Sequence, residues 1–260
     1  PLAMQLGGGE ASVRTSLAMV DAARGRREAR GGIDVWADLT IARATLGRNE
    51  GTFKIGYVGI DTLVGENILI GGLVQVDDFA ATGSGPGSAE GTGWMVGPYV
   101  TARLGERVYA DGRIAYGRSD NSISPFGTFV DGFDTQRLLF AGSLTGQVPL
   151  GGMAHLWPEV SLRYLREEQE AYVDALDIAI PAQTVDQGEL SFAPRFDYRI
   201  AQDNGWAILP YAQFEGVLSF GAGDNLVIEN GLRGRVELGA DMGSPTGWRI
   251  GINGFYDGLG

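Results

Sequence analysis

Apolar and polar residues alternate along most of the chain after Gly31, most clearly in the run from Trp94 to Gly117. Every second residue from Trp94 to Leu104 is apolar or small, and the alternation resumes after the turn at 105–107. Successive side chains of a β-strand point to opposite faces. The run therefore predicts an antiparallel hairpin with one apolar face and one polar face, the latter carrying Tyr99.

The same unit repeats to the end of the chain and predicts about eleven strands. The expected strands are 33–45, 52–64, 68–79, 94–104, 108–117, 136–149, 156–166, 189–200, 206–220, 232–241 and 248–257. Short turns are expected near Gly65, Gly105, Gly151, Asp203 and Ser244, and longer loops at 80–91, 119–134, 170–184 and 221–230. Tight turns at one rim and longer loops at the other are typical of outer-membrane barrels.

One helix is predicted, between Glu10 and Arg30. Val13, Leu17 and Val20 are spaced for one helical face, and the glycines at 31–32 end the pattern. We therefore divide the chain into a glycine-rich lead with a helix at 1–31 and a β domain at 32–260. The arginines of this helix are Arg14, Arg24, Arg26, Arg27 and Arg30.

Composition narrows the possible classes of protein. The net charge of −12 argues against nucleic-acid binding, which needs a basic surface. The absence of cysteine excludes disulfides and thiol chemistry. No window approaches the roughly 18 apolar residues of a membrane helix, but strands of about 9–11 residues can also span a bilayer. Residues 1–10 lack the basic and apolar parts of a signal peptide, so export would require a preceding segment.

Periodicity alone does not decide which solvent the apolar face meets. A soluble sandwich would bury this face, whereas a barrel of about eleven strands has an interior too wide for side chains to fill, so its apolar face would meet lipid. Aromatic residues near strand ends fit the girdles of a membrane barrel; they are Trp94, Tyr116, Tyr198, Trp206, Phe220, Trp248 and Tyr256. Four prolines fall within strands, where we expect bulges or rim positions: Pro98, Pro158, Pro194 and Pro210.

Several short motifs, in order, suggest a family. They are Val35-Trp36-Ala37, Gly97-Pro98-Tyr99, Asp111-Gly112, Glu237-Leu238-Gly239 and the closing run 254–260. Residues 31–260 resemble the C-terminal β-barrel translocator domain of autotransporters, the type V secretion proteins of Gram-negative bacteria. The resemblance implies an all-β, antiparallel, up-and-down transmembrane barrel of twelve strands with the N-terminal helix in its lumen. The chain departs from this pattern by ending before a twelfth strand, which would leave an unpaired edge.

The resemblance also implies a function and partners. It implies a monomeric barrel in the bacterial outer membrane that anchors an N-terminal passenger and helps to translocate it to the cell surface. Outer-membrane lipid, the barrel-assembly machinery and periplasmic chaperones would be its partners. Two alternatives remain open: a diffusion channel of porin type, and a soluble β-barrel or sandwich that acts as a binding domain.

The polar face supplies the candidate functional residues. We expect them to line a lumen, where the arginines of the helix would pair with carboxylates such as Glu159 and Glu215. Alternatively, these arginines form a solvated basic stretch before the β domain. The predicted lining consists of Arg103, Asp111, Arg113, Glu159, Arg163, Arg195, Asp197, Arg199, Glu215, Arg233, Arg235, Glu237, Asp241, Arg249 and Asn253.

Catalytic chemistry is not expected. His155 is the sole histidine and has no second histidine or thiolate in the sequence near it, so neither a metal site nor a catalytic triad is predicted. Nucleophile motifs are absent, and we predict no catalytic, cofactor or metal-binding residues. Some members of the resembled family cut their passenger at an asparagine inside the pore. Residues 1–33 contain no asparagine, so that reaction is not expected here.

Overall fold

The computed structural model describes residues 32–46, 49–83, 85–223, 231–244 and 249–259. All regular structure in these ranges is β, and they contain no helix long and apolar enough to cross a membrane. The predicted helix at 10–30 and its arginines lie outside the described residues. Trp248 and most of the predicted loop at 221–230 lie outside them as well.

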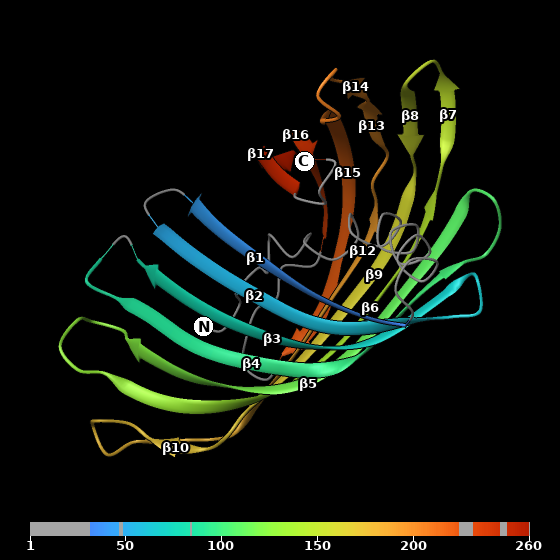
Figure 1. Cartoon of the computed structure of the whole chain (residues 1–260). Coiled ribbons are helices and arrows are strands. Elements are labelled where there is room, and N and C mark those ends of the chain that lie inside the picture. Colours follow the sequence, from blue (N-terminus) through green and yellow to red (C-terminus); the bar gives the residue numbers. More distant parts are fainter. Residues whose placement is uncertain (1–31, 47–48, 84, 224–230, 245–248, 260) are drawn as a thin grey trace.

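One antiparallel sheet contains almost all of the strands (Figure 1). Its strands are β1 (Ile33–Leu46), β2 (Asn49–Val64), β3 (Ile68–Thr82), β4 (Ser88–Arg103), β5 (Val108–Ser124), β6 (Asp131–Gly146), β7 (Val148–Gly151), β8 (Ala154–Trp157), β9 (Glu159–Gln169), β12 (Gln183–Phe192), β13 (Arg195–Tyr198), β14 (Ile200–Ala201), β15 (Ala207–Gly223), β16 (Gly231–Gly243) and β17 (Arg249–Leu259). A separate small hairpin, β10 (Tyr172–Val173) with β11 (Ala179–Ile180), lies in the loop after β9.

Several of these strands are pieces of one longer run. The pairs β6–β7 and β8–β9 and the trio β12–β13–β14 are interrupted by only one or two residues, and they keep their register across each break. In the part of the chain that the structure describes, the sheet therefore contains eleven continuous runs. The predicted number of strands is confirmed.

Prolines account for two of the breaks. Pro158 separates β8 from β9, and Pro194 lies between β12 and β13, because proline cannot donate a ladder hydrogen bond. Pro98 and Pro210 remain inside β4 and β15. The sheet shows no shift in register at any of these four positions, so the expected bulges are wrong.

Two of the predicted loops are much shorter than expected. β3 and β4 pair as far as Thr82 and Ser88, and β5 and β6 pair as far as Ile123 and Asp131. The loops predicted at 80–91 and 119–134 shrink to 83–87 and 125–130. Glycine, serine and aspartate have low strand propensity, but pairing with a neighbouring strand overrides that preference.

The apolar face of the sheet is the exposed face. On β5, Val108, Ile114 and Tyr116 are 44%, 52% and 44% exposed, whereas Tyr109 and Ala115, which point the other way, are buried. A soluble sandwich would bury the apolar face, so this arrangement contradicts that alternative. The sheet curls around its polar face (Figure 1), and among the described residues β1 pairs only with β2 and β17 only with β16.

On β3, β4 and β5 the outward apolar stretch is shorter than the strand itself. It runs over Ile68–Val76 on β3, Trp94–Ala102 on β4 and Val108–Tyr116 on β5, starting next to the short turns. Each stretch is about nine residues long, close to the ~9–11 residues of a tilted membrane-spanning strand. Beyond it the outward residues become polar, at Asp78, Thr92 and Arg118.

Candidate functional site

The polar inner face is the candidate functional surface, and Arg233 of β16 is the centre of an ion network among the described residues. Arg233 Nη2 lies 2.7 Å from Glu189 Oε1 on β12, and its Nε lies 3.1 Å from Asp257 Oδ1 on β17. Arg163 of β9 lies 3.6 Å from the other oxygen of Glu189. This group, which also includes Ser219, is called the Arg233 cluster. It links five neighbouring runs of the sheet through side chains alone.

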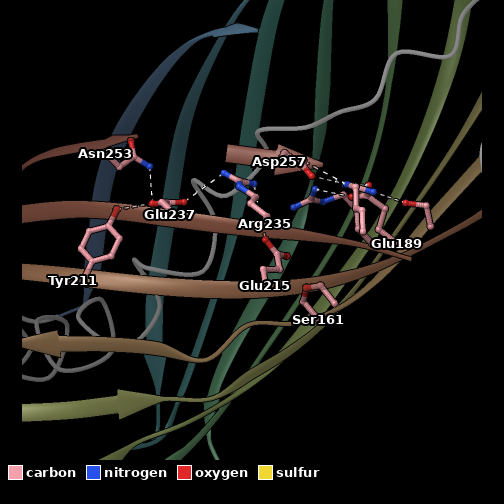
Figure 2. A network of polar contacts seen from close by, with 12 residues as sticks. Ser161, Glu189, Tyr211, Glu215, Arg235, Glu237, Asn253 and Asp257 are labelled. Atoms are coloured by element: carbon pink, nitrogen blue, oxygen red, sulfur yellow. Dashed lines mark hydrogen bonds and ion pairs between the residues drawn. The ribbon is translucent and has the colours of Figure 1, made fainter. Parts of the chain in front are cut away.

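Beside the Arg233 cluster, Glu237 collects three hydrogen bonds (Figure 2). It accepts them from the Tyr211 hydroxyl at 2.6 Å, Asn253 Nδ2 at 2.7 Å and Arg235 Nη2 at 3.4 Å. Arg235 also lies 3.9 Å from Glu215. Glu237 is only 2% exposed, and a carboxylate so buried requires such partners to remain charged.

Towards the short turns the same face continues with Arg195. Its guanidinium lies 2.6 Å from Asp241 Oδ2 and stacks 3.6 Å above the centre of the Tyr211 ring. Trp157 Nε1 donates to Asp197 at 2.7 Å, and His155 Nδ1 lies 3.6 Å from the second oxygen of Asp197. His155 therefore contacts a carboxylate.

On β1–β4, Tyr99 joins strands that are not neighbours. Its hydroxyl accepts a hydrogen bond from Trp36 Nε1 of β1 at 2.7 Å and donates one to Asp61 of β2. The ring crosses β3 at Gly71, where a Cβ atom would lie 2.6 Å from the ring. Glycine at this position therefore allows a side chain of β4 to reach β1.

Further along the inner face, polar contacts cross several strands again. Arg137 of β6 lies 2.8 Å from Asp77 of β3. Thr101 donates to Asp111 at 2.6 Å. Arg113 donates to Gln75 at 3.3 Å and also lies over the ring of Tyr57.

Most of the predicted lining residues lie on this face, although some are at its margin. Arg103 donates to the backbone carbonyls of the β4–β5 turn, and Glu159 accepts from Thr145 at 3.2 Å. Arg199 is exposed in the break between β13 and β14, outside the clusters. Arg249 pairs through its backbone with Gly243, and its side chain lies outside the described part of the chain.

The prediction missed several residues that contact other side chains of the inner face. They are Trp36, Asp61, Asp77, Arg137, Glu167, Glu189 and Tyr211. Glu167, Glu189 and Tyr211 lie on the same face of their runs as the predicted Glu159, Arg195 and Glu215, so the alternation of side chains along the strand could have identified them. The other four lie on the inner face of β1, β2, β3 and β6, strands from which no lining residue was predicted.

Carboxylates outnumber arginines on the inner face. The carboxylates with described contacts are Asp61, Asp77, Asp111, Glu159, Glu167, Glu189, Asp197, Glu215, Glu237, Asp241 and Asp257, and the arginines are Arg103, Arg113, Arg137, Arg163, Arg195, Arg233 and Arg235. Within the described ranges, no group of three or more histidine, aspartate or glutamate side chains is arranged to hold a metal ion.

The comparisons with known proteins agree with this architecture. The family model of the autotransporter β-domain matches residues 35–253. The β domain of the Bordetella autotransporter BrkA superposes with a TM-score of 0.70 at 22% identity, over 87% of this chain and 92% of that chain. The translocator domain of NalP from Neisseria meningitidis superposes with a TM-score of 0.64 at 21% identity, over 94% and 89%. A search of curated protein sequences finds no match.

The family match extends from the first strand into the last described strand, so it covers the sheet and its inner face. This protein belongs to the autotransporter β-domain family, whose members serve as outer-membrane anchors and translocators for a passenger linked to their N-terminal side.

Proposed function

We propose that this chain forms a monomeric barrel in a bacterial outer membrane, anchors its own passenger there and supports the passage of that passenger to the cell surface. The observation that carries the proposal is the inverted polarity of the sheet. Apolar side chains such as Val74 and Ile114 are about half exposed, whereas charged Glu237 and Arg235 are buried. Only a lipid surround makes this arrangement favourable, because a contiguous apolar surface of this size is costly in water.

The acidic excess of the inner face suits a basic segment within the barrel. The arginines at 24–30 of the chain would pair with carboxylates such as Glu159, Glu215, Glu237 and Asp241. Such pairing would occupy the lumen and reduce ion flow. An open diffusion channel of porin type would instead leave the lumen free.

The proposed role requires no catalysis, cofactor, metal or nucleic acid. The polar residues of the inner face are hydrogen-bonded across strands, which suits a structural wall. Because the outer face of the sheet is apolar, the unfolded chain would need periplasmic chaperones before insertion, and the barrel-assembly machinery would insert it.

Surface display tests the proposal. The full chain would be expressed behind a signal peptide, with an epitope tag before Pro1. We expect the β domain in the outer-membrane fraction and the tag accessible to antibody on intact cells. A matched chain lacking residues 32–260 should leave the tag inside the cell. Recovery of the β domain outside the outer-membrane fraction would refute the proposal.

Conductance in a planar bilayer separates the translocator from the porin alternative. The full chain should conduct weakly, and removal of residues 1–31 should raise the conductance several-fold, because the proposed occupant of the lumen is then missing. Equal and large conductance from both proteins would favour the porin-type channel.

A further inference from the structure

Arg118 stands on the outer face of β5 where the apolar stretch ends. It is exposed, and it follows the outward residues Ile114 and Tyr116, which are 52% and 44% exposed. Its direct cross-strand neighbours are Trp94 on β4 and Gln136 on β6, neither of which carries a charge. Arg118 therefore presents a positive charge at the edge of the lipid-facing surface, between two uncharged neighbours.

The other basic residues at this level of the outer face are paired. Lys54 lies 2.8 Å from Asp78 on the adjacent strand, and Arg166 lies 2.8 Å from Glu168 on its own strand. Among the described residues, no carboxylate lies within ion-pair distance of Arg118. Its guanidinium is thus available for an external anion, whereas the charges of Lys54 and Arg166 are largely neutralised.

The surface next to Arg118 fits the rest of an amphipathic ligand. Val96, Ile114 and Leu138 are 46%, 52% and 44% exposed on three adjacent strands, on the membrane side of Arg118. Trp94, directly across from Arg118, is 44% exposed, and tryptophan carries an N–H donor on its ring. Aromatic rings at this depth and a cation just beyond them are the features that recognise a lipid headgroup.

We propose that Arg118 and Trp94 bind the phosphate of an acylated, phosphorylated glycolipid of the outer leaflet, with Val96, Ile114 and Leu138 contacting its acyl chains. The site faces the outer leaflet because the long-loop end of a family barrel lies at the cell surface, so this inference rests on the proposed function. Asp120, the next outward residue of β5, and Asp134, which faces it on β6, are also exposed and lower the local positive potential, so Arg118 contributes a modest part of the affinity.

Lipid binding to the purified full chain in detergent tests the site. The probe is lipid A carrying its phosphates, and the comparison probe is the same lipid with its phosphates removed. Arg118→Gln should weaken binding of the phosphorylated probe about three- to ten-fold, as expected for one basic residue at an anionic surface. The matched control is Arg107→Gln, which removes an exposed arginine from the short turn at the opposite end of β5.

Three outcomes are informative. The inference is supported if only Arg118→Gln loses affinity, only for the phosphorylated lipid, and if inorganic phosphate competes poorly. It is overturned if Arg118→Gln and Arg107→Gln bind alike, or if removal of the phosphates has no effect. Fractionation of the cells that express the tagged chain tests the proposed function separately, since the β domain can reach the outer membrane and still lack this lipid site.

Discussion

Replacement of Arg233 by methionine is the most direct test of the inner-face network. Methionine keeps much of the length of the side chain but removes both ion pairs, at 2.7 Å to Glu189 and 3.1 Å to Asp257. Glu189 would keep only Arg163 at 3.6 Å, and Asp257 would lose its ion-pair partner on β16. The variant therefore leaves two poorly compensated carboxylates on the inner face.

The magnitude follows from the burial of the cluster. The side chains of Arg233, Glu189 and Asp257 are 18%, 16% and 24% exposed. Breaking a fully buried pair costs about 3–5 kcal/mol, and partial exposure reduces this, so we expect a loss of roughly 2–3 kcal/mol in the free energy of unfolding. Arg166→Met is the matched control, because Arg166 and Glu168 are 44% and 50% exposed and such a pair contributes at most about 1 kcal/mol.

Unfolding by denaturant in lipid vesicles, followed by tryptophan fluorescence, measures both variants. Adding Glu189→Gln and Asp257→Asn to Arg233→Met should restore most of the lost stability, because these changes remove the two carboxylates that have lost the arginine. Equal unfolding midpoints for Arg233→Met and Arg166→Met would refute the reasoning. So would a triple variant that is less stable than Arg233→Met alone.

Three further predictions follow from other parts of the barrel. Gly117→Ala should lower the free energy of unfolding by about 1–3 kcal/mol, because its Cβ would lie 1.8 Å from the backbone carbonyl oxygen of Trp94, whereas Gly216→Ala meets nothing within 4 Å and should be nearly neutral in the same assay. Val74→Arg on the lipid face should cost about 2–4 kcal/mol and reduce the amount of folded barrel in the outer membrane, whereas Ala80→Arg, beyond the apolar stretch of the same strand, should not. The passenger should remain joined to the barrel unless a separate protease is added, and a barrel fragment that starts within residues 10–30 without one would contradict this.

Most of the fold was predicted from the alternation of apolar and polar residues along the chain. The turns at 65–67, 104–107, 152–153 and 202–206 occur where the pattern breaks, and the apolar face is the exposed one. The ends of the strands near the long loops were less predictable. Residues 119–123 were predicted to be part of a loop because of their composition, yet they pair with 131–135 because the ladder of β5 and β6 continues past the lipid-facing stretch.

The contacts of the inner face were predictable as a surface but not as pairs. The alternation of side chains along a strand places Arg233 and Glu189 on the same face of the sheet. The register that brings them together across β15 is set by backbone pairing, which a single sequence does not specify. The same is true of Tyr99, whose contact with Trp36 depends on glycine at position 71 in β3 and at position 59 in β2, the two strands between them.

The position of the apolar stretch along the strands also determines how this barrel would sit in a membrane. On β3, β4 and β5 the stretch begins beside the short turns, and all of the additional strand length lies at the other end. For β5 this is Gly117–Ser124, whose outward residues include Arg118 and Asp120 and therefore cannot lie in the hydrocarbon core without cost. With the short turns in the periplasm, as in outer-membrane barrels generally, the strands must project beyond the outer leaflet as a polar wall. A translocator with this shape extends its lumen past the membrane surface, so that a passenger segment would leave the barrel above the lipid headgroups.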